Sequence, residues 1–223
     1  MNEPSPHKTL VLLSGGADSF YCILKQLRET DDVIHVHSHW LENNRPLSDD
    51  AHVKNKLKAE KEHRDKYVIP WLQRNEREFT TSFSYHDFSD MPQDAFFVNR
   101  TRFTLYIAAM YGQAYGVGRI LSGHDFSMGF PKYNNGDCEK IISAGWLGRP
   151  PEDLEWITPR AHLPKEKVYE YLGDLADLTF SCNAPRLQQD GVWQWCEECC
   201  QCLDIIRARG SLPDIRREMR HAA

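Results

Sequence analysis

The sequence of 223 residues has no excess of basic residues and no long apolar run. Lysine and arginine together number 27 against 32 aspartates and glutamates, so the formal net charge is −5. Nucleic-acid-binding surfaces need clustered positive charge, and the composition therefore argues against direct binding to DNA or RNA. Apolar runs of about 20 residues, which a membrane-spanning helix requires, are absent. The polar start of the chain lacks the apolar core of a signal peptide, so we expect a cytoplasmic protein.

Two common phosphate-binding motifs are also missing. A Walker A loop requires Gly-Lys followed by Ser or Thr, and that pattern does not occur. A dinucleotide-binding fingerprint requires Gly-x-Gly-x-x-Gly, but Gly116-Val117-Gly118 is followed by Leu121 where the third glycine would stand. A phosphate site in this chain must therefore use a different loop.

A glycine-rich turn near the N-terminus provides such a loop. The apolar run from Leu10 to Leu13 predicts a short buried strand, and the apolar content of residues 20–25 predicts a helix after it. Glycines between them allow a tight turn close to a ligand, and the free amides at a helix start favour an anion such as phosphate. The candidate phosphate-binding residues are Leu13, Ser14, Gly15, Gly16, Ala17, Asp18 and Ser19.

Apolar segments alternate with helical patterns along the rest of the chain. Strands that alternate with helices indicate an α/β protein with a parallel, Rossmann-like sheet. The charged segment 48–75 predicts a long, mostly exposed helix broken near Pro70. Residues 132–151, rich in Gly, Asn and Pro, predict a long loop. We predict further strands at residues 33–37, 79–85, 119–123 and 154–158, and helices at 94–115 and 164–178.

Three histidines fall on one face of the second predicted strand, because alternate residues of a strand point the same way. They are His35, His37 and His39. Such a set could bind a metal ion, but the same alternation occurs in any strand with a polar side. We favour the second interpretation.

Four of the seven cysteines lie between residues 196 and 202. In a reducing compartment such crowding indicates a metal site and not disulfides. Cys196-x-x-Cys199-x-x-Cys202 supplies three thiolates and Cys182 a fourth, which suits a closed, structural zinc site. An iron–sulfur cluster on the same four thiols is the less favoured alternative. We assign Cys200 to packing, although an exchange with Cys199 as a ligand stays open.

The loop and the cysteine tail together resemble the QueC family, the 7-cyano-7-deazaguanine synthases of queuosine biosynthesis. The resemblance extends over most of the chain. Its motifs here are Ser14–Ser19, Arg100 with the apolar helix that follows, Asp125-Phe126-Ser127, Gly129-Phe130-Pro131, Ile157-Thr158-Pro159 with Lys165, Thr179-Phe180-Ser181-Cys182, and Cys196, Cys199 and Cys202 with Arg207 and Gly210.

The resemblance implies the fold of the PP-loop ATP pyrophosphatases, with an ATP-binding domain at residues 1–163 and a C-terminal helical, zinc-binding segment at 164–223. It also implies a carbon–nitrogen ligase that forms AMP and pyrophosphate. The carboxylate of 7-carboxy-7-deazaguanine attacks the α-phosphorus of ATP, ammonia attacks the acyl-adenylate, and a second ATP dehydrates the amide to the nitrile. Mg²⁺ usually accompanies the ATP, and the family's habit is a homodimer.

Roles for individual side chains follow from the same resemblance. Asp18 and Ser19 belong to the catalytic ATP loop, with Asp18 placed to hold Mg²⁺ or its water shell. Arg100 is expected to neutralise a carboxylate or phosphate in substrate binding and catalysis, with an ordinary surface salt bridge as the alternative. Asp125 and Phe130 are the other expected substrate-binding residues, and Asp125 is expected to pair with the guanine-like edge of the base.

Two departures from the family leave the product open. The family has Tyr-Gly-Gln-Arg-His after its second strand, where this chain has His-Ser-His-Trp-Leu at residues 37–41. The acid, cysteine and arginine expected after Pro131 are replaced by Lys-Tyr-Asn, with Asp137-Cys138 as a candidate remnant. The alternative function is therefore a diverged enzyme that passes the acyl group to another amine, for example on a protein partner. Trp193 and Trp195 are candidates for a dimer interface or for the core.

Overall fold

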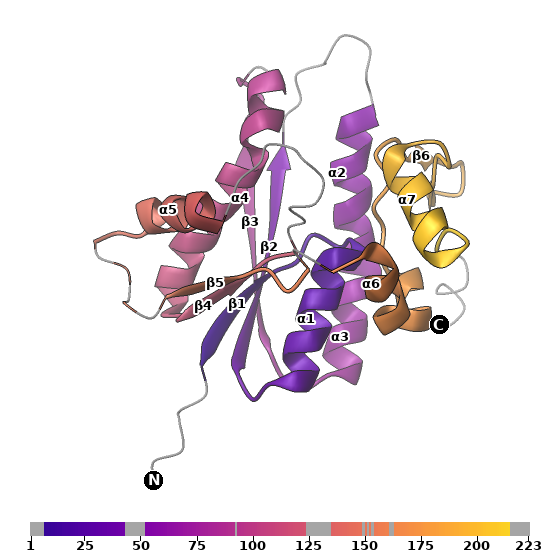
Figure 1. Cartoon of the computed structure of the whole chain (residues 1–223). Helices are drawn as coiled ribbons and strands as arrows, with labels where there is room; N and C mark the ends of the chain where they lie inside the picture. Colours follow the sequence, from indigo (N-terminus) through magenta and orange to yellow (C-terminus); the bar gives the residue numbers. More distant parts are fainter. Residues whose placement is uncertain are drawn as a thin grey trace.

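The computed structural model describes residues 7–42, 52–91, 93–123, 135–148, 150, 152, 154–160 and 163–214. Five parallel strands form its central sheet in the order β3-β2-β1-β4-β5 (Figure 1). This arrangement confirms the predicted Rossmann-like α/β fold. The strands are β1 (Lys8–Leu12), β2 (Val33–Glu42), β3 (Thr80–Asp87), β4 (Arg119–Leu121) and β5 (Glu155–Ile157).

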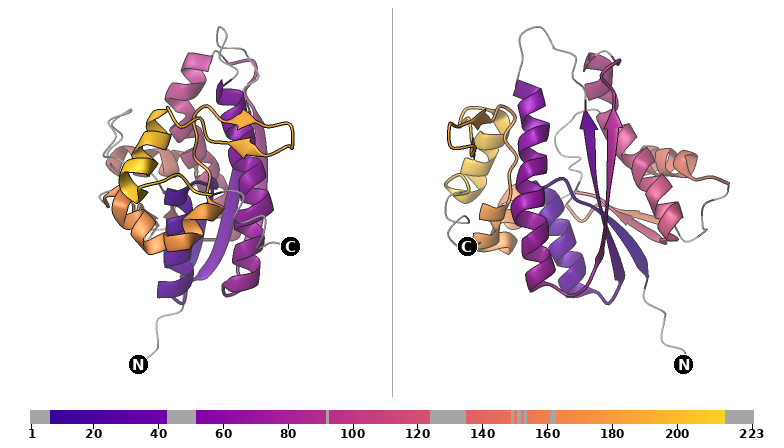
Figure 2. Two further views of the ribbon diagram at one scale, coloured as in Figure 1. Left: turned by 90° about the vertical axis from the view of Figure 1, so that its right-hand side faces the viewer. Right: turned by 180° about the vertical axis from the view of Figure 1, so that it is seen from behind.

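The central strand β1 is buried on both faces, as is usual in a parallel sheet covered by helices. Leu10 and Leu12 pack into one core, and Val11 and Leu13 into another. Successive strand residues point to opposite faces, so an unbroken apolar run serves both cores. As Figure 2 shows, α1 (Ala17–Glu29), α3 (Ile69–Asn75) and α6 (Lys165–Leu172) cover one face, and α4 (Gln93–Tyr115) and α5 (Asn135–Gly145) the other.

The charged segment forms α2 (His52–His63), a five-residue π-helical turn η1 (Arg64–Val68) and then α3, in direct succession. The prediction of a mostly exposed helix broken near Pro70 is wrong in both respects. Leu72 is fully buried, and Arg64 exposes only 1% of its surface. The irregularity precedes Pro70, which occupies the first turn of α3, where its missing N–H is tolerated.

Helix α5 lies inside the segment that the composition predicts to be a long loop, and that prediction is wrong over the length of the helix. Cys138 and Ile142 are one helical turn apart, and both are buried against the α4 side of the sheet. Gly145 lies so close to α4 that a Cβ there would be 2.8 Å from the Cβ of Ala109. Cys138 is thus a core residue.

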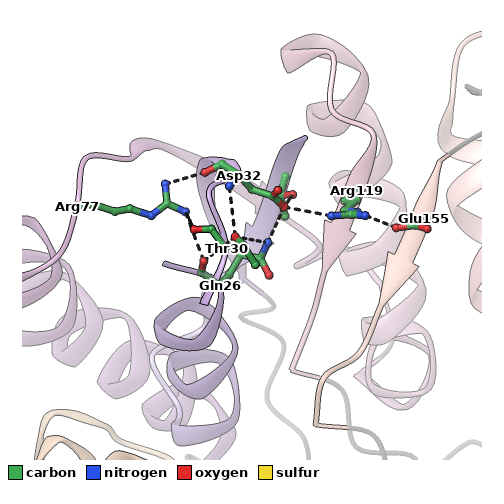
Figure 3. A network of polar contacts seen from close by, with 7 residues as sticks. Gln26, Thr30, Asp32, Arg77, Arg119 and Glu155 are labelled. Atoms are coloured by element: carbon green, nitrogen blue, oxygen red, sulfur yellow. Dashed lines mark hydrogen bonds and ion pairs between the residues drawn. The ribbon is translucent and has the colours of Figure 1, made fainter. Parts of the chain in front are cut away.

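A polar network ties together the strand ends at the edge of the sheet where β1, β4 and β5 begin (Figure 3). The Asp32 carboxylate accepts hydrogen bonds from Thr9 at 2.8 Å and from Gln26 at 2.6 Å, and it faces Arg119 of β4 at 3.4 Å. Arg77 donates to four backbone carbonyls at the end of α1 and in the turn to β2. These bonds hold the starts of the strands in place. A ligand would bind at the other edge of the sheet, where the same strands end.

The C-terminal segment packs on the α1 side of the sheet, where α6 contacts α1. The predicted helix 164–178 is α-helical to Leu172 and continues as a 3₁₀ helix, η2 (Gly173–Leu178). A two-stranded antiparallel sheet and helix α7 (Cys200–Arg209) follow; the strands are β6 (Arg186–Leu187) and β7 (Trp193–Gln194). None of the described helices has both the length and the apolar character of a membrane span.

Candidate functional site

The loop after β1 lies where the strand order of the sheet reverses. From β1 the sheet extends through β2 and β3 on one side and through β4 and β5 on the other. Parallel sheets bind ligands beyond the carboxyl ends of their strands at such a point. Helix α1 begins at Ala17, so the amides of its first turn, which lack intrahelical acceptors, lie there too. A Cβ on Gly123, after β4, would be 2.8 Å from the Ser19 nitrogen, which shows how closely β4 approaches this turn.

Both glycines of the loop are required by close packing. Gly15 has a φ of +102°, and a Cβ there would lie 2.8 Å from the Cβ of Arg64. A Cβ on Gly16 would lie 2.6 Å from the Oγ of Ser181. The Phe180 amide donates to the Gly15 carbonyl at 3.1 Å. The loop is therefore held between the η1 turn and the segment that leads into the C-terminal cysteines.

Two serine hydroxyls close the loop on itself. Ser14 Oγ and Ser19 Oγ lie 3.1 Å apart, and Ser19 Oγ donates to the Gly16 carbonyl at 3.0 Å. The Gly16 amide donates to Ser14 Oγ at 3.3 Å, and the Ser14 amide donates to Ser19 Oγ at 3.2 Å. The loop thus has a defined shape before any ligand binds, which lowers the entropic cost of binding.

The carboxylate of Asp18 is shared by two cations from later in the chain. Arg160 Nε donates to Oδ1 at 2.7 Å, and Lys165 Nζ donates to Oδ2 at 3.1 Å. The Arg160 side chain is 4% exposed and also donates to the Leu163 carbonyl. Two cationic side chains thus lie beside one carboxylate on this side of the loop.

A cavity of about 250 Å³ opens beside the loop. Ser14, Gly16, Asp18 and Ser19 line it, together with residues from the end of β2, from α2 and η1, from α4 and from the segment before the cysteines. The α2 and η1 side contributes Lys61 and Arg64. The cavity thus combines loop amides, hydroxyls and cationic side chains, which is a suitable environment for a phosphorylated ligand.

Four cysteine thiols converge behind this cavity, namely Cys182, Cys196, Cys199 and Cys202, with all four Sγ atoms within 4.8 Å of one another. Cys202 Sγ lies 3.8, 3.5 and 3.7 Å from the Sγ atoms of Cys196, Cys199 and Cys182. A tetrahedral zinc ion with bonds of about 2.3 Å requires thiolates about 3.8 Å apart. The four thiols therefore fit one ion such as zinc. A four-iron cluster is larger than one ion and would hold its thiolates farther apart, so the geometry disfavours that alternative.

The surroundings of the thiols also suit metal binding. Burial raises the pKa of the Cys182 thiol to about 12, which by itself opposes the thiolate form, and the hydrogen bond from the Cys196 amide acts in the opposite direction. Burial would raise the pKa of Cys199 too, but hydrogen bonds from the Cys202 and Asn183 amides outweigh it and lower that pKa to about 7. Cys196 also donates its amide to Cys182 Sγ at 3.3 Å. Amide donors to sulfur stabilise thiolates, the form that binds a metal.

The remaining residues of this tail occupy clear positions. Cys200 is exposed and accepts a hydrogen bond from the Asn183 side chain, so its predicted packing role is wrong. Trp193 is buried and donates to Glu62 of α2 at 2.7 Å. Trp195 packs on Phe180, with ring centroids 4.5 Å apart. Trp193 is a member of the buried cluster around the thiols and the partly buried Trp195 packs against that cluster, which supports the core interpretation.

A comparison of the whole sequence with protein-family models identifies the family of this chain. A family model described as "Queuosine biosynthesis protein QueC" matches residues 8–211. The chain belongs to the QueC family. QueC proteins are enzymes of the PP-loop ATP pyrophosphatase type that act in queuosine biosynthesis, as the sequence resemblance implies. The chain is also similar to the crystal structure of a predicted subunit of tRNA methyltransferase from Methanocaldococcus jannaschii, with 16% identity, a TM-score of 0.43, and coverage of 93% of this chain and 90% of that one.

The structure brings together part of the predicted QueC site. All seven loop residues lie at the carboxyl end of β1, and Ser14, Gly16, Asp18 and Ser19 line the cavity. Arg100 lies in α4, whose Thr101 and Thr104 line the cavity, but its side chain is outside the described part of the structure. Asp125 and Phe130 are outside the described residues altogether. The roles of these three residues stay predictions.

Three cations near the QueC loop were missed by the sequence analysis. Arg160 directly follows Thr158-Pro159, and that adjacency to a family motif was the available signal. Lys61 and Arg64 lie in a charged helix that resembles a solvated surface. The close contact between Gly15 and Arg64 is created by the fold, and no sequence pattern would have indicated it.

The three histidines of β2 lie on one face of the strand, and each forms hydrogen bonds with hydroxyl groups. His35 and His37 are buried, and each uses both ring nitrogens, at 2.7 to 3.1 Å, on hydroxyl groups of β3. Their rings stack on tyrosines of α4. Neutral imidazoles satisfied in this way support the interpretation as a polar strand face. The ladder runs Thr80, His35, Ser82, His37, Ser84 and His86.

Proposed function

We propose that this QueC family member activates the carboxylate of 7-carboxy-7-deazaguanine with ATP. Ammonia then converts the acyl-adenylate to the amide, and a second ATP converts the amide to 7-cyano-7-deazaguanine. The enzyme is thus a carbon–nitrogen ligase that releases AMP and pyrophosphate. The observation that carries the proposal is the Ser14–Ser19 loop, set at the reversal point of the sheet beside a cavity in a chain that the QueC model covers almost entirely.

In the first step a carboxylate oxygen attacks the α-phosphorus, the bond from that phosphorus to the bridging oxygen breaks, and pyrophosphate leaves. Negative charge moves onto the leaving group as this bond breaks. The amides at the start of α1 and the two cations that contact Asp18 are suited to stabilising such charge. Because the loop is already closed by its serines, this stabilisation needs little reorganisation.

Asp18 and Ser19 carry side-chain oxygens of the loop, as Ser14 does, and in this proposal Asp18 and Ser19 would hold the Mg²⁺ that accompanies ATP. When bound, the ion would neutralise part of the phosphate charge. Asp18 also fixes Arg160 and Lys165, which keeps two cations beside the leaving group. Arg100, Asp125 and Phe130 are proposed to bind the base and its carboxylate. Zinc at the four thiols is structural, and the enzyme acts as a homodimer.

A second candidate is a diverged QueC enzyme that transfers the activated acyl group to a different amine, for example on a protein partner. One observation favours it. The residues that replace the family's Tyr-Gly-Gln-Arg-His stretch include His39, Trp40 and Leu41, and these three line the cavity. This wall of the cavity therefore differs from the family pattern, and in this second proposal the amine enters beside it.

The deciding experiment incubates purified protein with 7-carboxy-7-deazaguanine, Mg·ATP and ammonium, and follows AMP and base products by mass spectrometry. Nitrile with AMP supports the synthase. AMP with only adenylate or amide supports the diverged transferase. Absence of AMP with this base refutes the substrate assignment.

Two variants calibrate this assay. Asp18→Asn removes the carboxylate shared by Arg160 and Lys165, and we expect it to lower AMP formation by at least about 100-fold. Asp31→Asn makes the same chemical change at an exposed residue next to β2, at the opposite edge of the sheet, and should leave the rate unchanged.

A further inference from the structure

Arg64 carries a buried charge that the protein leaves incompletely bonded. Its side chain is 2% exposed, and its Nη2 atom finds no hydrogen-bond partner among the described residues. Only its Nε is paired within this part of the structure, with Asp65 Oδ1 at 2.8 Å. A guanidinium stays charged at all physiological pH values, and burying an unpaired charged donor is costly. Such a group in a cavity wall points to an anionic ligand.

The position of Arg64 identifies which anion. Arg64 lines the same cavity as Ser14, Asp18 and Ser19, and its Cβ lies directly against Gly15 of the loop. Arg64 is also the first residue of the π-helical turn η1, a rare geometry that often occurs at functional sites. The side chain of Arg64 therefore starts against the loop and forms part of the wall of the same cavity.

Two sides of the cavity share one charge pattern. Asp65 accepts from both Arg64 and Lys61, the latter at 2.7 Å, so one carboxylate again serves two cations. Asp18 does the same for Arg160 and Lys165. Glu60, which also lines the cavity, is 3.7 Å from Lys56 and adds no net charge as a pair. Each side thus holds two cationic side chains around one carboxylate, which suits a multiply charged anion such as a polyphosphate.

We propose that Arg64, assisted by Lys61, binds the β- and γ-phosphates of ATP across the cavity from Asp18. This inference rests on the proposed ATP-dependent function and adds a substrate-binding residue to it. The guanidinium holds the pyrophosphate portion as it leaves, and the Phe83 ring, 5.6 Å from the Arg64 Cζ, supports it from the sheet side. The nucleoside end of ATP does not contact Arg64.

The test compares Arg64→Gln, Arg64→Lys and a control, Arg74→Gln, in binding inorganic pyrophosphate and AMP separately by calorimetry. Arg74 is an exposed arginine on α3 of the same helical run. We expect Arg64→Gln to weaken pyrophosphate binding about 10- to 100-fold, the usual effect of losing a charged hydrogen bond. AMP affinity should change less than about twofold. Arg64→Lys keeps the positive charge but loses the planar guanidinium donors, so its pyrophosphate affinity should lie between those of Arg64→Gln and wild type.

A thermal melt distinguishes ligand binding from a structural role. Because Nη2 is unpaired, Arg64→Gln without ligand should melt no lower than wild type, but it should lose most of the stabilisation that pyrophosphate gives. Unchanged pyrophosphate affinity in Arg64→Gln overturns the inference and leaves the proposed function intact. Equal losses for AMP and pyrophosphate, or a lower melting temperature without ligand, also overturn it. Failure of wild type to bind pyrophosphate, AMP or ATP refutes the proposed function itself.

Discussion

Mild acid should destabilise this protein through two buried histidines. His37 is fully buried between β2 and α4, and burial, with smaller contributions from nearby charges, lowers its pKa to about 3. His63 of α2 is buried between Tyr67 and Phe180, and burial lowers its pKa to about 3 as well. In the unfolded chain both titrate near about 6.5. The unfolded state therefore takes up protons at a higher pH than the folded state.

The sign and size of the effect follow from proton linkage. A lowered pKa in the folded state gives stability that is complete above about pH 6.5 and is lost progressively as the pH falls toward about 3. Each pH unit in that window removes up to about 1.4 kcal/mol per histidine. Between neutral pH and pH 5 the two histidines together should lower the free energy of unfolding by about 4 kcal/mol. This is a large part of the usual 5 to 15 kcal/mol of folding stability.

Urea unfolding at pH 7.5, 6.5, 5.5 and 5.0 measures this loss directly. His37→Gln keeps a polar side chain but cannot titrate in this range. We expect it to be less stable than wild type at pH 7.5, because Ser82 and Ser84 each lose one of their two histidine partners. Its further loss between pH 7.5 and 5.0 should be about 2 kcal/mol smaller than that of wild type.

His7→Gln is the matched control, because His7 is exposed. It should follow the wild-type curve at every pH. If wild type and His37→Gln lose stability in parallel between pH 7.5 and 5.0, His37 is not held neutral by burial and the reasoning is wrong.

Three further predictions concern the sheet edge, the loop and the thiols. Arg77→Met removes donors to four backbone carbonyls and should lower the free energy of unfolding by about 2 to 4 kcal/mol in urea titrations, whereas exposed Arg74→Met should change it by less than about 0.5. In Gly15→Ala the new Cβ would collide with Arg64, and alanine rarely adopts the positive φ of this position. Calorimetry should therefore show loss of ATP binding together with a lower melting temperature. Cys202→Ser should lose bound zinc in a metal assay and melt lower, whereas Cys200→Ser should keep one equivalent; equal zinc in both variants would contradict the four-thiol site.

The sheet was predictable from sequence because its signals are local. The run Leu10–Leu13 is apolar at every position, as a strand buried on both faces must be, and the Ser-Gly-Gly turn follows it directly. The cysteine spacing was equally informative, since few arrangements other than a metal site place thiols so close. Family motifs then added the order of the remaining elements.

Other features depend on contacts between distant segments. Helix α5 forms because Cys138 and Ile142 meet a surface of α4, and the Gly and Asn residues around them obscure that pattern. The π-helical turn follows from packing and leaves no mark in composition. Arg160 and Asp18 are far apart in sequence, and only the folded chain brings their charges within 2.7 Å.

The segment Thr179–Cys182 connects the Ser14–Ser19 loop with the cluster of four thiols. Its Phe180 amide holds the Gly15 carbonyl, Ser181 lies against Gly16 and lines the cavity, and Cys182 is the next residue in the chain. A metal ion that orders Cys182 therefore also orders one side of the nucleotide loop. With the proposed zinc and ATP both bound, thermodynamic linkage makes this coupling reciprocal, so any factor by which zinc raises ATP affinity is also the factor by which ATP raises zinc affinity. A cell short of zinc would then lose the metal first from enzyme molecules that have no nucleotide bound.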